Sequence, residues 1–338
     1  MSILLSITLL ANATQAASSG ACAAVPLPQS LSTAAQAYLS SEADRRFITS
    51  SPETVEDWIQ LQAIMRDHGE RFVVEAEERR TVSIERTNLG GVNIAWVSPS
   101  DKVPSSDGPL IFNLHDGGFA LNDGDAALYT AVSFAELQQL DSVSVDYRLT
   151  PQHPYPAALE DAVAAYAVIK RKMPGRPIVV YGLSAGGGLG AAFLLKVKQL
   201  GLPMPEAAVL NSPWSDVSMN SDTLATLDCY DPLLGGSRPT LKPLANSYAA
   251  GADPQDPLVS PVYGDWEGVD VPVLLISGTR DVMLGDTVRL HRAMWRAGVP
   301  AELIVNEGMW HAFSVEPEFE AMIADSARFI RHISAKED

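Results

Sequence analysis

Cysteine is nearly absent from this sequence. Its 338 residues include only two cysteines, Cys22 and Cys229. Two thiols cannot build a disulfide framework or a cysteine-based zinc site, so the fold must depend on a hydrophobic core. If the protein is exported, an oxidising compartment would allow these two residues to pair. We expect no cofactor and no metal.

Basic residues are also scarce. Lys and Arg number 24 against 41 Asp and Glu, which gives a formal net charge of −17. Binding to nucleic acid depends on clustered Lys and Arg, and the sequence has no such cluster, so we exclude that class of partner. With 46% hydrophobic residues and 19% charged residues, the chain can bury the core of one large α/β domain with insertions.

The N-terminal apolar run, residues 3–10, is too short to span a membrane as a helix. Small residues at 11–13 and 14–16 follow it, as at a signal-peptidase site, so we expect residues 1–16 to be a signal peptide and the protein to be exported. No Lys or Arg precedes the run, which leaves an uncleaved N-terminus and a cytoplasmic protein as the alternative. A lipid anchor at Cys22 is disfavoured, because residues 19–21 lack the apolar residue expected there.

The rest of the chain is organised by alternating strand and helix patterns. Helices are predicted at 32–39 and from 54 to about 68, and two strands at 82–84 and 92–97 flank a turn at 88–91. Further strands are predicted at 109–114, 142–146, 177–181, 207–210, 271–276 and 301–305, with helical patterns after most of them. This order predicts the α/β class, with a mostly parallel eight-stranded sheet covered by helices on both faces.

One long segment interrupts this alternation. Residues 211–267 contain turns, prolines and aromatics but no strand pattern. Because the segment follows the strand at 207–210, we expect it to lie over the carboxyl edge of the sheet, where α/β proteins bind ligands. We therefore divide the chain into an N-terminal arm, 17–75, and a domain at 76–338 with an insertion at about 212–266.

A serine lies at the turn between a predicted strand and a predicted helix. The stretch Gly182-Leu-Ser-Ala-Gly186 follows a short apolar run, and Leu189 and Phe193 then recur at helical spacing. It matches the nucleophile elbow G-x-S-x-G, in which a sharp turn exposes the serine hydroxyl. Roughly one chain in ten of this length carries the pattern by chance, so Ser184 needs partners elsewhere.

A serine hydroxyl becomes a nucleophile when a histidine takes its proton and a carboxylate orients that histidine. Around such an elbow the acid and then the histidine follow the serine along the chain. His311 fits, because it comes directly after the last predicted strand. Asp281 follows the strand at 271–276 and is the preferred acid, while Asp286, inside the next helical pattern, is its rival.

The oxyanion formed during such an attack needs backbone N–H donors already in place. Ala185 supplies one at the elbow. The stretch Leu114-His-Asp-Gly-Gly-Phe119 follows a predicted strand, and its glycines let backbone groups approach a bound carbonyl. We therefore expect this stretch to supply the other donors.

These stretches resemble those of the bacterial hormone-sensitive-lipase-type (family IV) esterases of the α/β-hydrolase superfamily. The resemblance covers about residues 85–335 and rests on His115-Asp-Gly-Gly-Phe119, the stretch 146–161, Gly182-Leu-Ser-Ala-Gly-Gly187, Asp281 with Leu284 and Asp286, and His311-Ala-Phe313. It implies a catalytic triad of Ser184, Asp281 and His311 and an oxyanion hole of Gly117, Gly118 and Ala185. It also implies that His115 and the stretch 146–161, including His153, serve the architecture rather than the chemistry.

The sequence departs from this family at two positions. Asp116 replaces the first glycine of the family's glycine triplet, which could alter the loop while the two donor positions remain. Leu183 replaces the polar residue that usually precedes the nucleophile, which removes a possible hydrogen bond that would support the triad.

The resemblance implies a serine carboxylic ester hydrolase that acts on short to medium acyl chains through an acyl-enzyme intermediate, with the arm and the insertion as a cap. Two alternatives are amide or peptide hydrolysis on the same triad, and a non-catalytic binding protein of the same fold. The presence of His311 disfavours the second alternative. The expected partner is a small-molecule ester, without nucleic acid or a stable membrane span, and an exposed last strand would permit a homodimer.

Overall fold

A computed structural model describes residues 25–41, 52, 54–100, 108–236 and 238–334 of the chain. The predicted signal peptide at 1–16, Cys22 and most of the polar loop at 102–108 lie outside these residues, so export stays a prediction. Cys229 is disulfide-bonded. None of the described helices is both long and apolar enough to cross a membrane.

Eight strands form one sheet in the order β1-β2-β4-β3-β5-β6-β7-β8. The strands are β1 (Val82–Leu89), β2 (Val92–Pro99), β3 (Leu110–Leu114), β4 (Asp141–Asp146), β5 (Ile178–Leu183), β6 (Ala207–Asn211), β7 (Val273–Gly278) and β8 (Ala301–Asn306). The six strands from β3 to β8 pair in parallel, while β2 runs antiparallel to both β1 and β4. The predicted mostly parallel sheet of eight strands is confirmed.

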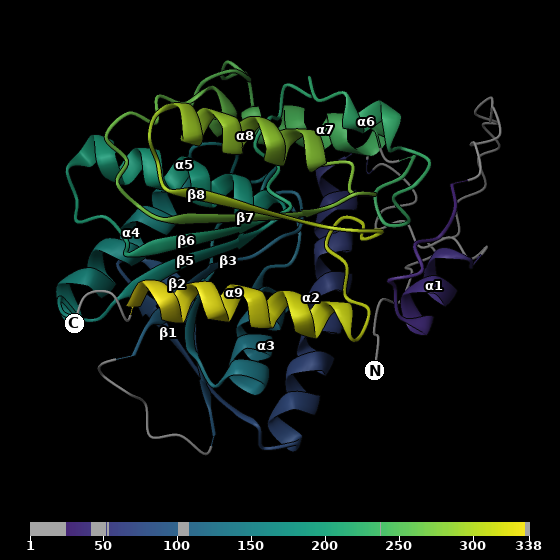
Figure 1. Cartoon of the computed structure of the whole chain (residues 1–338). Coiled ribbons are helices and arrows are strands. Elements are labelled where there is room, and N and C mark those ends of the chain that lie inside the picture. The colour runs from purple at the N-terminus through teal and green to yellow at the C-terminus, as the bar shows by residue number, and fades with distance from the viewer. Residues whose placement is uncertain (1–24, 42–51, 53, 101–107, 237, 335–338) are drawn as a thin grey trace.

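Helices cover both faces of this sheet (Figure 1). The first face carries α4 (Ala157–Lys172), α5 (Ala185–Leu200) and α8 (Leu284–Arg296), and the opposite face carries α3 (Tyr129–Gln138) and α9 (Glu318–Ser334). The other described helices are α1 (Thr33–Leu39), α2 (Val55–Glu78), α6 (Thr223–Thr226), α7 (Arg238–Ala249) and the short 3₁₀ helices η1 (Gly124–Leu128) and η2 (Pro261–Tyr263).

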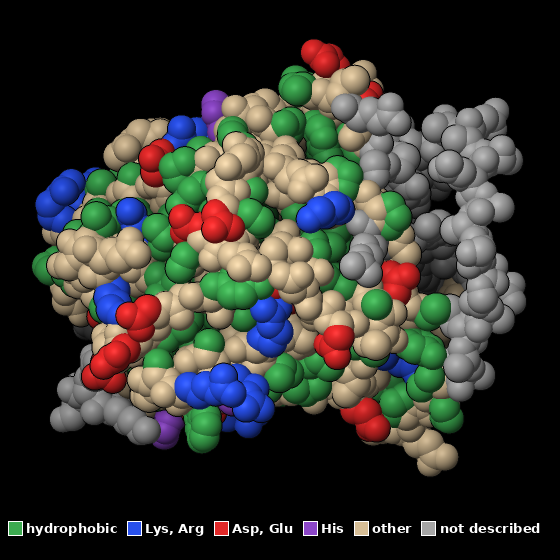
Figure 2. Space-filling model, turned by 90° about the horizontal axis from the view of Figure 1, so that it is seen from above, with side chains coloured by type: hydrophobic (Ala, Val, Ile, Leu, Met, Phe, Trp, Pro, Cys, Tyr) green, Lys and Arg blue, Asp and Glu red, His purple; other side chains and the backbone are tan. Residues whose placement is uncertain are grey.

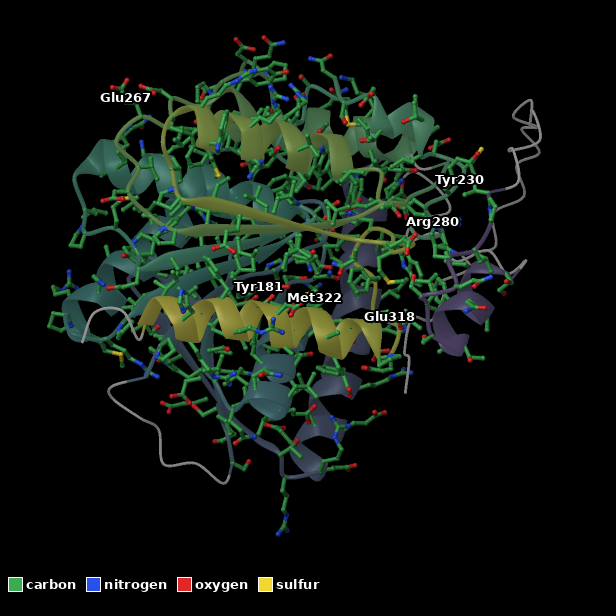
Figure 3. All side chains as sticks on the ribbon, viewed as in Figure 1. Tyr181, Tyr230, Glu267, Arg280, Glu318 and Met322 are labelled. Carbon is green, nitrogen blue, oxygen red and sulfur yellow. The ribbon has the colours of Figure 1, made fainter. Side chains whose placement is uncertain are left out.

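The central strand β5 shows why both faces must be covered. Its side chains alternate between the two layers: Val180 packs with α4 and α5, whereas Val179 and Tyr181 pack toward α9. In Figure 3, Tyr181 and Met322 lie together between the sheet and α9, and the Tyr181 hydroxyl is 3.9 Å from the Met322 sulfur. A strand with apolar residues on both sides is stable only when buried on both sides, as the uninterrupted apolar run predicted.

The helix expected at 54 to about 68 is correct at its start and wrong at its end. Thr54 and Asp57 form a capping box at the start of α2. The helix then continues ten residues beyond His68, to Glu78. Gly69 and the charged residues after it weaken the local helical pattern, but Val73 and Ala76 are buried in a core shared with α3. Tertiary packing therefore extends the helix past the point where propensity favours an end.

The described part of the N-terminal arm is joined to the C-terminal part of the molecule. The carboxylate of Glu318, at the start of α9, accepts hydrogen bonds from the backbone N–H (2.7 Å) and the hydroxyl (2.9 Å) of Ser32, which caps α1. The Arg280 guanidinium donates to the Pro26 carbonyl at 3.3 Å. Figure 3 shows Glu318 and Arg280 on the side of the molecule where α1 lies.

Among its described residues the segment 212–266 contains helices α6, α7 and η2 and no strand, as predicted. It begins directly after β6, and both α6 and α7 lie on the side of the molecule toward which the parallel strands run (Figure 1). Helix α7 brings Leu241 and Leu244 to a cavity that also contains Ser184. The insertion thus approaches the carboxyl edge of the sheet, and this edge carries the candidate site.

Candidate active site

Ser184 occupies a strained turn between β5 and α5. Its backbone angles, φ 57° and ψ −119°, lie in a region that residues with a side chain rarely adopt. Two backbone hydrogen bonds hold the turn: the Ser184 N–H donates to the Asn211 carbonyl, and the Trp214 N–H donates to the Ser184 carbonyl, both at 2.9 Å. A Cβ at Gly186 would lie 2.0 Å from the Leu114 carbonyl oxygen, so only glycine permits this approach of α5 to β3.

The structure brings Ser184, His311 and Asp281 into one hydrogen-bonded row. His311 Nε2 is 2.8 Å from Ser184 Oγ, and His311 Nδ1 is 3.0 Å from Asp281 Oδ1. Because a carboxylate accepts, Nδ1 carries the proton of the neutral ring, which leaves Nε2 to accept from the serine hydroxyl. The three residues follow β5, β8 and β7, so the parallel sheet places all of them at one edge.

Asp281 is held as an ionised acceptor. Its carboxylate also accepts hydrogen bonds from the Ser277 hydroxyl (2.7 Å) and the Met283 N–H (2.8 Å). Burial alone would raise the pKa of Asp281, but its charge interaction and hydrogen bond with His311 outweigh burial and lower it. Burial likewise tends to lower the pKa of His311, yet the nearby carboxylates, Asp281 first, raise it above the ordinary value.

The rival acid, Asp286, serves a different part of the structure. It lies on α8, fully buried, and accepts a hydrogen bond from the Asp216 N–H at 3.1 Å. Burial and the neighbouring Asp216 carboxylate raise the pKa of Asp286 well above its ordinary value. Its position on the helix keeps it out of hydrogen-bonding contact with His311.

A second carboxylate beside the histidine, Asp231, escaped the sequence analysis. Asp231 Oδ2 accepts from the Val282 N–H (3.1 Å) and from the His311 N–H (3.2 Å), so it joins the loops that carry Asp281 and His311. Burial, followed by the charge of Asp281, raises the pKa of Asp231 to about 6. The one local signal was the turn-forming pair Asp231-Pro232 within an insertion without regular structure.

The loop after β3 presents the other predicted donors. Gly117 and Gly118 have φ values of 106° and 64°, and both line the cavity at Ser184. Within the described part of the chain, the N–H groups of Gly117, Gly118 and Ala185 donate to no protein acceptor. Three unpaired donors around one cavity can receive a developing negative charge on a bound carbonyl.

His115 joins the loop after β3 to Tyr147, the residue that follows β4. Its ring stacks on Tyr147, with ring centres 3.9 Å apart, and the Tyr147 hydroxyl donates to the His115 carbonyl at 2.8 Å. Burial is the main cause that lowers the pKa of His115. The stretch 146–161 therefore contacts the loop through Tyr147, in agreement with an architectural role, and His153 lines neither of the cavities described below.

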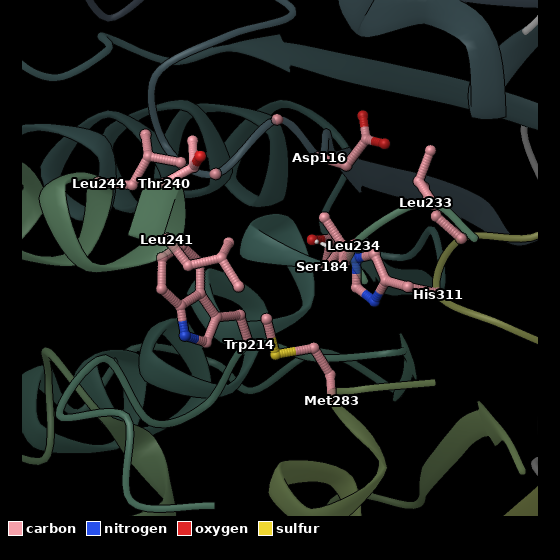
Figure 4. Close-up of a pocket in the computed structure, with 13 residues that line it drawn as sticks. Asp116, Ser184, Trp214, Leu233, Leu234, Thr240, Leu241, Leu244, Met283 and His311 are labelled. Carbon is pink, nitrogen blue, oxygen red and sulfur yellow. Dashed lines mark hydrogen bonds between the residues drawn. The ribbon is translucent and has the colours of Figure 1, made fainter. Parts of the chain in front are cut away.

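The cavity at Ser184 is small and mostly apolar (Figure 4). It has a volume of about 40 Å³. Its lining combines residues at the carboxyl edge of the sheet with apolar side chains of the insertion and of the loop after β7: Asp116, Gly117, Gly118, Ser184, Trp214, Leu233, Leu234, Thr240, Leu241, Leu244, Met283, His311 and Ala312. Leu183 points elsewhere, into a neighbouring larger cavity.

Comparison with known proteins agrees with this geometry. The family of alpha/beta hydrolase fold proteins matches residues 111–315. The chain is 32% identical to an acetyl-hydrolase of Streptomyces hygroscopicus over 72% of its own length and 81% of that protein. It is 31% identical to an esterase of Acinetobacter venetianus over 74% and 82%, respectively.

Solved structures show the same likeness. A crystallised esterase superposes with a TM-score of 0.81 at 29% identity, and the match covers 92% of this chain and 97% of that chain. A hormone-sensitive lipase from a metagenome library superposes with a TM-score of 0.73 at 31% identity, covering 84% and 94%.

Proposed function

Because this chain belongs to the α/β-hydrolase family and is a carboxylic ester hydrolase of the hormone-sensitive-lipase type, we propose that it works through an acyl-enzyme on Ser184. Asp281 and His311 complete the catalytic triad in this proposal. The observation that carries it is the row of two hydrogen bonds, 2.8 Å and 3.0 Å long, that joins the three side chains at the end of a small cavity.

In the first step, His311 Nε2 takes the Ser184 proton while Oγ bonds to the carbonyl carbon of the ester. Negative charge moves to the carbonyl oxygen, which the N–H groups of Gly117, Gly118 and Ala185 stabilise. These donors are unpaired within the described residues, so they need no rearrangement to receive the oxyanion.

In the second step, the bond between the carbonyl carbon and the alcohol oxygen breaks, and protonated His311 gives its proton to the leaving alcohol. A water molecule, deprotonated by His311, then attacks the carbonyl carbon of the acyl-serine. The bond from this carbon to Ser184 Oγ breaks, His311 returns the proton to Oγ, and the carboxylic acid is released. Asp281 stays ionised throughout and stabilises the charged histidine.

The acyl group belongs at the short end of the expected short to medium range. The cavity at Ser184 measures about 40 Å³, and the large side chains of Trp214, Leu241, Leu244 and Met283 are part of its lining. The Streptomyces relative is named an acetyl-hydrolase, which agrees with a small acyl group. The arm at 17–75 and the insertion at about 212–266 act as a cap, because both contribute residues to cavities at this edge.

Replacing the nucleophile tests the proposal. Ser184→Ala should lower kcat for para-nitrophenyl acetate by about 10⁴-fold or more, since no residual group forms the acyl-enzyme. The exposed Ser100→Ala is the matched control and should hydrolyse the ester at the wild-type rate. Mass spectrometry after treatment with a phosphonate should place the covalent adduct on Ser184. Full activity in Ser184→Ala, or an adduct on another residue, would overturn the mechanism.

A further inference from the structure

A second cavity lies next to the one at Ser184 and is much larger. Its volume is about 210 Å³, five times that of the first. Its walls include parts of α2, of η1 and the start of α3, of the end of β5, and of the segment from Ala312 into the start of α9. We call it the second cavity, and the one at Ser184 the first cavity.

The two cavities share part of their walls. Asp116, Leu233 and Ala312 line both. In Figure 4, Asp116 and Leu233 lie on one side of Ser184 and His311, whereas Trp214 and Met283 lie on the other. An ester bound at Ser184 can therefore extend in both directions.

The position of His311 decides which half of the ester enters which cavity. Its Nε2 must reach the leaving oxygen, so the alcohol portion lies on the histidine side of the reacting carbon. His311 lines the first cavity, Ala312 lines both cavities, and Phe313 lines the second, so the chain leads from the histidine into the second cavity. We therefore assign the acyl group to the small first cavity and the bulkier alcohol portion to the second.

The charge of the second cavity is negative. Its lining includes the carboxylates of Asp116 and Asp125 and, among the described residues, no Lys or Arg. Asp125 is paired with Arg86 at 2.7 Å. Asp116 has no such counter-ion within the described part of the chain and accepts one hydrogen bond, from the Asn122 amide at 2.7 Å. This carboxylate is present only because an aspartate replaces the first glycine of the loop.

Two further features suit a cation. The rings of Phe72, Tyr129 and Phe319 form a connected group on the wall, with ring centres 4.9 Å and 5.9 Å apart, and aromatic rings attract cations. His68 Nδ1 lies 2.9 Å from the Ile64 carbonyl and must donate to it. Nε2 of the neutral His68 ring is then an acceptor, not a donor.

We propose that the second cavity binds a cationic alcohol portion of the substrate, an ester of an amino alcohol or a quaternary ammonium alcohol, with Asp116 as its charge partner. This inference rests on the proposed ester hydrolysis at Ser184 and adds the substrate class. Asp116 is a specificity-determining residue in this account, because it selects the leaving group and takes no part in the proton transfers.

A pair of esters that differ only in charge tests the inference. Acetylcholine and its neutral carbon analogue, neohexyl acetate, share the acyl group and have nearly the same shape. We expect the wild-type kcat/KM to be about tenfold higher for acetylcholine. In Asp116→Asn the ratio of kcat/KM for acetylcholine to kcat/KM for neohexyl acetate should fall about tenfold. Asp123→Asn, which removes a nearby carboxylate that does not line the cavity, should keep the wild-type ratio.

Binding without turnover gives a second measurement, in case the variant is slow. Choline should inhibit hydrolysis of para-nitrophenyl acetate competitively, and its inhibition constant should rise about tenfold in Asp116→Asn. Equal kcat/KM for the two esters, or an unchanged ratio in Asp116→Asn, would overturn the inference. Ser184-dependent hydrolysis of para-nitrophenyl acetate without any charge preference would leave the proposed function intact, whereas loss of that dependence would remove both.

Discussion

At the scale of single residues, the loop after β3 shows why one glycine of the family pattern can be replaced and the next cannot. Asp116 is not among the residues with positive φ, so a side chain is tolerated there without strain. Gly117 has φ 106°, and a Cβ on it would lie 2.4 Å from the Leu121 carbonyl oxygen. The loop can therefore gain a carboxylate at its first position while its donors stay in place.

Gly117→Ala should disable the proposed oxyanion hole. The added methyl group would push the loop away from Leu121 and move the Gly117 and Gly118 N–H groups off the carbonyl oxygen. We expect kcat for para-nitrophenyl acetate to fall about 100-fold or more, with a much smaller change in KM. Gly175→Ala is the matched control, because nothing lies within 4 Å of its added Cβ. Equal kinetics for the two variants would exclude Gly117 from the site.

The three hydrogen-bonded side chains of Ser184, Asp281 and His311 could be selected from the sequence because each follows the end of a strand. Ser184 follows an apolar run and a glycine pattern, and His311 and Asp281 each follow a later run, so the parallel sheet had to bring them to one edge. Asp231 was not predictable in this way. Its hydrogen bonds to Val282 and His311 span 51 and 80 residues. No local periodicity in the sequence predicts these hydrogen bonds, because they depend on how the irregular insertion folds.

At the scale of elements, the strands were easier to predict than the helix ends. Buried parallel strands consist of nearly continuous apolar residues, which stand out against the polar turns around them. The end of α2 depends on Val73 and Ala76, which pack against α3. The local sequence near His68 does not predict this contact. The cavities were equally hidden, because their walls combine α2, the insertion and the loop before α9.

Asp231 connects the insertion with the loop that carries Asp281 and with the loop that carries His311. Its negative charge also affects the pKa of His311. The histidine must be neutral to take the Ser184 proton, so activity is lost as the pH falls through the pKa of His311. The Asp231 carboxylate helps to raise that pKa. In Asp231→Asn the acid limb of the kcat/KM profile should therefore move to lower pH, by roughly half a unit to one unit.

A measured pH profile separates this electrostatic effect from a purely structural one. Asp228→Asn is the control, since Asp228 lies in the same segment and accepts only from the Gly236 N–H among the bonds described. It should leave the acid limb in place. A lower kcat in Asp231→Asn without any shift of the acid limb would mean that Asp231 only holds the loops together.

At the scale of the whole molecule, the net charge of −17 decides the sign of the electric field around the protein. On the face seen in Figure 2, the described Lys and Arg side chains are interspersed with Asp and Glu. The electric field of this net negative charge attracts cations from a distance and repels anions. Salt screens the field over about 10 Å at 0.1 M. It acts on a substrate before the substrate reaches Asp116.

Ionic strength should therefore affect charged and neutral esters differently. Between about 10 mM and 500 mM NaCl, kcat/KM for acetylcholine should fall several-fold, while the value for neohexyl acetate stays nearly constant. The decline should persist in Asp116→Asn, because the global charge changes by a single unit. A parallel response of the two esters to salt would contradict electrostatic attraction of the substrate.

The strained backbone at Ser184 also affects the stability of this protein. A residue with a side chain held at φ 57° and ψ −119° costs on the order of 1–3 kcal/mol, a large fraction of the stability of an ordinary domain. Selection for stability alone would replace this serine by glycine, which adopts such angles freely. The rest of the fold therefore holds Ser184 in a backbone conformation that costs free energy, which a glycine at this position would not require.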